Sequence, residues 1–187
     1  VARLYAGECY LHLGDFNNAV KYLKEFDANG AWAAQGQVIP ALLDSLQTEP
    51  FLHLAPPKST GRDLFHAQWL AEQLSDFQDM SAIDVQASLV HLSARSATEA
   101  LVRFAPKASR LWVCGGGAYN LHLMSLLGSY LPKVEVSTTA SHGLPPLQVE
   151  AAAFAWLARQ FVLGLPGNLP NVTGAKGLRV LGGLYPA

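Results

Sequence analysis

Charged residues and cysteines are scarce in this 187-residue chain, and each shortage argues against a class of protein. Only 14% of the residues are charged, the net charge is −1 and no cluster of Lys and Arg occurs, so no nucleic-acid partner is expected. The two cysteines, Cys9 and Cys114, lie far apart, which fits a reduced, cytoplasmic setting better than a disulfide framework. We expect no membrane span and no signal peptide, because the chain has no apolar run of roughly 18 residues and no basic start followed by an apolar stretch.

Hydrophobic residues make up 50% of the chain, which is enough to bury a sizeable core in one domain or one large lobe. The order of the expected elements predicts an α/β fold in which helices cover a sheet. We also assign Phe154, Trp156 and Leu157 to the core. Apolar periodicity predicts helices over residues 30–35, 40–46, 64–74, from 81 up to Pro106, and over 149–163, and strands over 111–114 and 134–138.

The most informative stretch is LWVCGGGAYN at 111–120. A buried strand that runs into three glycines and then a helix starting at Asn120 is typical of nucleotide-binding α/β proteins. The glycines let backbone pass close to a ligand, because no side chain intervenes. On their own they are weak evidence for a ligand site, because such a run is more often a plain tight turn.

Residues 1–25 have a different pattern. Their small and apolar positions predict two short amphipathic helices joined at Gly14-Asp15, and the stretch LGDFNNAV resembles a single tetratricopeptide repeat. About three stacked repeats are usually needed for an independent solenoid. We therefore expect a helical hairpin that either recruits a partner or packs on the residues that follow.

Five blocks in the rest of the chain resemble one enzyme family. In chain order they are FDANGAWA at 26–33, PPKSTGRD at 56–63, VCGGGAYN at 113–120, EAAAFAWLA at 150–158 and GLPGNLPNVTGA at 164–175. This series resembles the C-terminal half of the anhydro-N-acetylmuramic acid kinases. Residues 26–187 are accordingly identified as a C-terminal lobe of that family.

The resemblance implies the fold shared by actin, sugar kinases and heat-shock ATPases, in which two α/β lobes close on ATP and substrate. It implies a cytoplasmic ATP- and Mg²⁺-dependent reaction on 1,6-anhydro-N-acetylmuramic acid during peptidoglycan recycling. Water opens the anhydro ring and the 6-oxygen receives a phosphoryl group, which gives N-acetylmuramic acid 6-phosphate. A carboxylate is the natural base for that water. The family forms dimers, so a homodimer is compatible with this chain.

The resemblance also suggests site residues. Gly115, Gly116 and Gly117 match the turn on the adenosine side of the nucleotide, and Asn120 either caps the following helix or contacts the nucleotide. Glu150 matches a glutamate that faces the sugar. Its alternative role is that of a carboxylate favoured at a helix N-terminus by the helix dipole.

A turn rich in cations and hydroxyls is the other candidate. Lys58, Ser59, Thr60 and Arg62 could together hold an anion, although charged turns are more often simply solvated. The histidines and cysteines show no metal-ligand spacing, so we expect no metal site beyond nucleotide-bound Mg²⁺. His142 is assigned a structural place at the rim.

Residues 1–25 depart from the family. They match neither the Gly-Thr-Ser-x-Asp-Gly phosphate loop of the N-terminal lobe nor its base aspartate, and the Asp-x-Gly-Pro-Gly segment before Phe26 is missing too. No catalytic residue is therefore assigned, and we expect the chain to be inactive alone. The alternative hypothesis is a non-catalytic binding or scaffold protein that uses the hairpin.

Overall fold

The computed structural model describes residues 30–185 with the exception of 62 and 78. The hairpin predicted over residues 1–25 lies outside the described residues. In chain order the elements are the 3₁₀ helix η1 (Ala33–Gln35), α2 (Pro40–Gln47), α3 (Pro50–His53), α4 (Ala67–Gln73), α5 (Ala82–Phe104), β1 (Arg110–Val113), η2 (Gly116–Tyr119), α6 (Leu121–Tyr130), β2 (Glu135–Thr138), η3 (Thr139–His142), η4 (Pro146–Gln148), α7 (Val149–Val162) and α8 (Pro170–Thr173).

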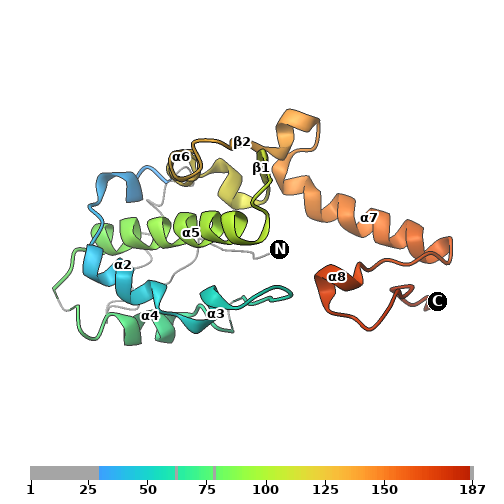
Figure 1. Cartoon of the computed structure of the whole chain (residues 1–187), viewed down its shortest axis with the longest axis horizontal. Helices are drawn as coiled ribbons and strands as arrows, with labels where there is room; N and C mark the ends of the chain where they lie inside the picture. Colours follow the sequence, from blue (N-terminus) through green and yellow to red (C-terminus); the bar gives the residue numbers. More distant parts are fainter. Residues whose placement is uncertain (1–29, 62, 78, 186–187) are drawn as a thin grey trace.

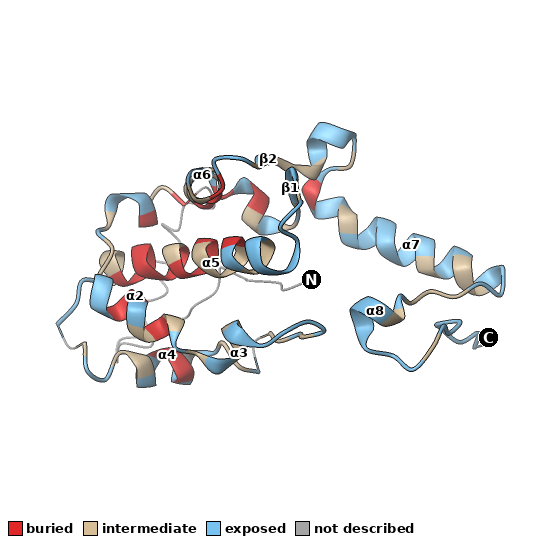
Figure 2. Cartoon of the chain, viewed as in Figure 1, coloured by how far each residue is buried: buried red, intermediate tan, exposed pale blue. Residues whose placement is uncertain are grey.

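The 23-residue helix α5 is the centre of the fold, and two cores form on its two sides. Helices α2, α3 and α4 lie on one side of it, and α6, β1 and β2 lie on the other (Figure 1). On the first side, leucines of α2 and α4 pack against apolar residues of α5, and Figure 2 shows this buried layer in red. On the second side, Val90 and Ala94 of α5 meet Leu123 and Leu127 of α6.

Strands β1 and β2 form a two-stranded parallel sheet, with Leu111 opposite Val136 and Val113 opposite Thr138. Leu111 and Val113 pack against the second core, whereas Trp112 between them is exposed. This alternation follows from the two-residue period of a strand. The predicted α/β class and the predicted strands are therefore confirmed, with one face of the sheet covered.

The segment before α2 is anchored on α5 through its backbone. The Gln37 N–H donates to the Asp84 carboxylate (2.7 Å) and the Ile39 N–H donates to the Ser88 hydroxyl (2.9 Å). Gly36 lies so close to the Ile83 carbonyl that a side chain there would collide with it. The helix predicted over 30–35 is reduced to the single turn of η1.

Helix α7 has the predicted range but none of the predicted burial. It extends away from the rest of the molecule (Figure 1), and no residue on it is buried. Phe154 is 64% exposed and Trp156 is 49% exposed, so their assignment to the core is wrong. Leu157 is half-buried, because the C-terminal segment folds back along the helix and places Gly167 against it.

Candidate functional site

The glycine turn directly follows β1. Gly115 has a φ of +76°, a backbone conformation that residues other than glycine rarely adopt. No atom lies within 4 Å of the position that a Cβ at Gly115 or Gly116 would take. The first glycine is thus required by its backbone conformation, and open space beside the turn is compatible with a ligand.

Asn120 closes the turn and starts α6. Its side-chain Oδ1 accepts a hydrogen bond from the Leu123 N–H (2.8 Å), and its own N–H donates to the Gly117 carbonyl (3.2 Å). Asn120 is only 7% exposed. Of the two roles predicted for Asn120, the helix cap is present in the structure. The cap provides a partner for the Leu123 N–H, which has none within the first turn of the helix. The nucleotide contact stays a prediction.

Gly30 lies directly against Asn120. Its φ is +80°, and a side chain at position 30 would occupy the space of the Asn120 amide. Gly30 therefore places the start of the described chain against the end of the glycine turn. Gly30 was predicted to begin a helix, although the Asn-Gly pair at 29–30 is a common signal for positive φ.

The start of α7 adjoins the glycine turn. The Gly115 N–H donates to the Pro146 carbonyl (3.0 Å), which ties the turn to η4, and α7 follows η4 directly. Glu150 lies in the first turn of α7 and is exposed. The turn and the glutamate, which are distant in sequence, thus stand at neighbouring positions of the fold.

Lys58 is held at the end of α3. Its ammonium group donates to the carbonyls of Phe51 and Leu52 (both 2.8 Å) and lies 4.8 Å from the centroid of the Phe51 ring. Burial lowers the pKa of Lys58, and the positive charge of Arg103 lowers it further. The Phe51 carbonyl also accepts from the Leu54 N–H (3.3 Å), so Lys58 adds a second donor at this helix end.

Ser59 and Thr60, the other described members of the anion cluster, lie away from the glycine turn. Ser59 is exposed, Thr60 is half-buried, and Arg62 lies outside the described residues. The loop after α3 runs below α5 in Figure 1, whereas β1 and the turn lie above it. The structure does bring this loop to the C-terminal segment, because Pro57 lies against Gly174. The anion site stays a prediction.

Two further findings concern the chemistry that the fold can support. No three His, Cys, Asp or Glu side chains of the described residues form a group that could hold a metal ion. None of the helices in the described ranges combines the length and the apolar character that crossing a membrane requires. His142, assigned to the rim, is exposed and contacts Trp112, with 4.3 Å between the ring centroids and the ring planes tilted by 53°.

A parallel strand, a glycine turn with positive φ and a capped helix define a mixed α/β protein with the loop geometry of nucleotide-binding folds. Residues 13–187 match the family model described as anhydro-N-acetylmuramic acid kinase. The chain belongs to the anhydro-N-acetylmuramic acid kinase family. The match begins inside residues 1–25, earlier than the block at 26–33.

Individual relatives agree. A protein of Variovorax paradoxus named anhydro-N-acetylmuramic acid kinase is 52% identical over 162 residues, which cover 87% of this chain and 43% of the relative. Proteins of the same name from Albidiferax ferrireducens and Pseudomonas paraeruginosa are 48% and 49% identical, over 96% and 88% of this chain. The chain thus spans less than half the length of these relatives, 43% to 45%.

Proposed function

We propose that this chain supplies the C-terminal half of an ATP-dependent kinase that acts on 1,6-anhydro-N-acetylmuramic acid. The observation that carries the proposal is the glycine turn at Gly115, which follows a parallel strand and is hydrogen-bonded to the segment that leads into α7. Family membership adds the substrate class, because the relatives carry the name of that kinase.

In this proposal each part of the site has one task. The backbone of residues 115–117 passes beside the adenosine part of ATP, and Asn120 fixes the end of the turn through its cap. Glu150 faces the sugar and orients it by accepting hydrogen bonds from its hydroxyl groups. Water adds to carbon 1 and breaks its bond to the 6-oxygen, which then takes the γ-phosphoryl group as ADP leaves.

The base for that water is proposed to come from the part of the family that these residues do not span. No described residue is assigned to it, and for this reason the chain is proposed to be inactive alone. Mg²⁺ bound to ATP neutralises charge on the phosphates. No residue of this chain is assigned to Mg²⁺, since the described residues contain no group of metal-ligating side chains.

Nucleotide binding is tested by hydrogen exchange of the full chain with and without ATP and Mg²⁺. We expect slower exchange over residues 113–124 when nucleotide is present, because a bound nucleotide excludes water from the turn. Gly116→Val is the test variant, since its side chain would occupy the open space beside the turn. Gly128→Ala on α6 is the matched control, since nothing lies near that glycine.

Protection that disappears in Gly116→Val but persists in Gly128→Ala supports the assignment. If millimolar nucleotide slows exchange elsewhere but leaves residues 113–124 unchanged, the adenosine-side role of the turn is wrong.

A further inference from the structure

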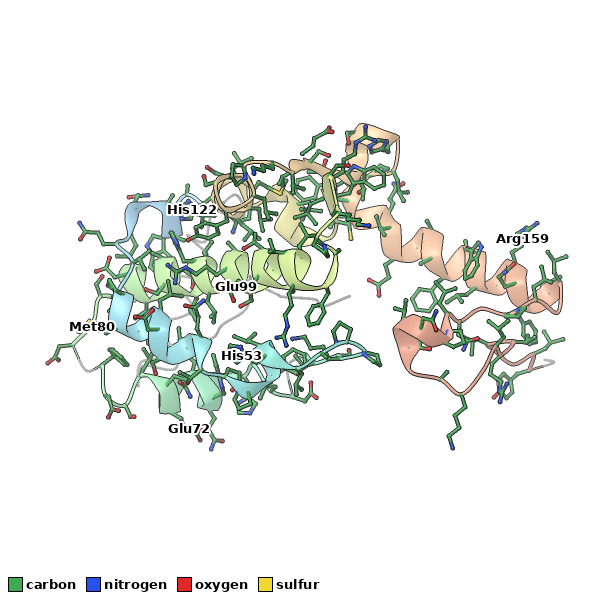
Figure 3. The ribbon with its side chains drawn as sticks, in the orientation of Figure 1. His53, Glu72, Met80, Glu99, His122 and Arg159 are labelled. Atoms are coloured by element: carbon green, nitrogen blue, oxygen red, sulfur yellow. The ribbon has the colours of Figure 1, made fainter. Side chains whose placement is uncertain are left out.

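Two histidines meet where α6 packs on α5. The ring of His91 on α5 lies 5.9 Å from the ring of His122 in the first turn of α6, centroid to centroid. Nδ1 of His91 is 2.7 Å from the hydroxyl of Tyr130, the last residue of α6. His122 is labelled in Figure 3, where α6 lies above α5. One histidine of α5 therefore contacts both ends of α6.

The charges that act on His91 are positive. They come from His122 and from Arg95, which lies one turn further along α5. Arg95 is held in place, because its Nη1 donates to the side chain of Gln47 on α2 (2.9 Å).

The acidic groups on the neighbouring elements are engaged elsewhere. On α5, Asp84 accepts from the Gln37 N–H and Glu99 accepts from the Gln47 amide (3.4 Å). Asp44 of α2 is exposed, and η1 contains no titratable side chain. On the strands, Glu135 pairs with Arg110 (3.2 Å). Among the described residues, no ion pair or hydrogen bond joins a carboxylate to either histidine.

The surroundings of both imidazoles therefore favour the neutral form of each ring. Burial lowers the pKa of His91, and the charges of His122 and Arg95 lower it further. Burial also lowers the pKa of His122. Each group then binds a proton more readily in the unfolded chain than in the folded one. Their contribution to stability is complete above the ordinary value of about 6.5 and is lost as the pH falls below it.

We propose that His91, His122 and Tyr130 form a pH-sensitive contact that holds α6 on α5 near neutral pH and loosens it when both imidazoles take up protons. When both rings are protonated, the Tyr130 hydroxyl can bond to Nδ1 of His91 only as an acceptor, and two like charges replace a neutral ring contact. Helix α6 begins directly after Asn120, so the helix that loosens is also the one that ends the glycine turn.

The first test is hydrogen exchange of the full chain at about pH 7.5 and about pH 5.5, corrected for the intrinsic rate at each pH. Protection over α6 is expected to fall by at least about threefold at the lower pH, the factor for one pair of like charges at this separation in water. In the double variant His91→Gln/His122→Gln, protection over α6 should no longer depend on pH. The control variant His142→Gln, which changes an exposed histidine of η3, should keep the pH dependence of the wild type. Equal pH dependence in the double variant would overturn the proposal.

A second test uses the wild-type chain and one mild variant, and so does not depend on the double variant folding. The ring protons of His91 are followed by NMR through a pH titration, in the wild type and in His122→Gln. The titration midpoint of His91 is expected to shift upward when His122 is removed, because a neighbouring positive charge is lost. An unchanged midpoint would show that the two rings do not sense each other and would contradict the proposal.

Discussion

Glycine residues show most clearly how single positions fix this fold. Gly115 needs its positive φ, and the run of three glycines predicted a turn at this place. Gly36 is required by a neighbour, the Ile83 carbonyl, and Gly30 is required both by its positive φ and by the Asn120 amide beside it. Those neighbours are distant in sequence, and no local pattern identifies them. At this scale the sequence predicts backbone conformation well and tertiary contact poorly.

A pair of glycine substitutions separates these effects. Gly36→Ala forces a methyl group onto backbone that cannot rotate away, so we expect a loss of about 1–3 kcal/mol in the free energy of unfolding. Gly128→Ala in the open interior of α6 should stabilise the chain by about 0.5–1 kcal/mol, because alanine favours a helix. Urea unfolding of both variants measures this difference. A neutral Gly36→Ala would contradict the close packing of this segment on α5.

Lys58 and Asn120 mark the limit of prediction at the candidate site. The sequence suggests an anion contact for Lys58, yet its ammonium donates to two carbonyls at the end of α3. Asn120 was predicted either to cap a helix or to contact the nucleotide, and the cap is present. Polar residue types indicate that a group will be bonded, but the partner follows only from the tertiary fold.

Among the elements, the length of a helix or strand decides whether the sequence predicts it. Apolar periodicity predicted α2, α5, α6 and both strands to within a few residues. The four-residue helices α3 and α8 were missed, because one turn is too short to show a period. Each begins with proline, and α3 is also capped by the Glu49 carboxylate, which accepts from the Phe51 N–H (3.2 Å). Such local signals indicate where a helix can begin, but they do not predict that a helix forms there.

The residue range of α7 was predicted correctly, whereas the burial predicted for its Phe154 and Trp156 is wrong. A largely apolar helix is normally buried, and for this reason its aromatic residues were expected in the core. The described residues provide only the returning C-terminal segment to cover it. Burial depends on the surface opposite a helix, which the helix's own sequence does not contain.

Two truncations test this contrast between elements. Leu43→Ala on α2 removes a side chain that is 2% exposed, and we expect it to lower the free energy of unfolding by about 2–5 kcal/mol. Phe154→Ala on α7 removes a largely exposed ring and should change it by no more than about 0.5 kcal/mol. Chemical denaturation at low protein concentration compares them. A loss at Phe154 as large as that at Leu43 would mean that α7 is covered in solution.

For the whole molecule, two features concern surfaces and extent. Parallel sheets are usually covered on both faces, yet the face that carries Trp112 is exposed here, as is α7. The chain also spans only 43% to 45% of the relatives described above. The family and the α/β class could be predicted from the five sequence blocks. The two-lobed arrangement and a homodimer stay predictions, because they depend on surfaces beyond the described residues.

The central claim is that these residues are half of a kinase. Its most direct test is mass-spectrometric turnover of 1,6-anhydro-N-acetylmuramic acid with ATP and Mg²⁺. The chain is assayed alone and mixed with the part of the Variovorax paradoxus relative that precedes the matched region, with Glu150→Gln as the variant and Gly128→Ala as its control. We expect no product from the chain alone, N-acetylmuramic acid 6-phosphate from the mixture, and at least about a tenfold lower rate with Glu150→Gln, since a lost charged hydrogen bond costs about 1.5–3 kcal/mol. Product from the unmixed chain would contradict the claim.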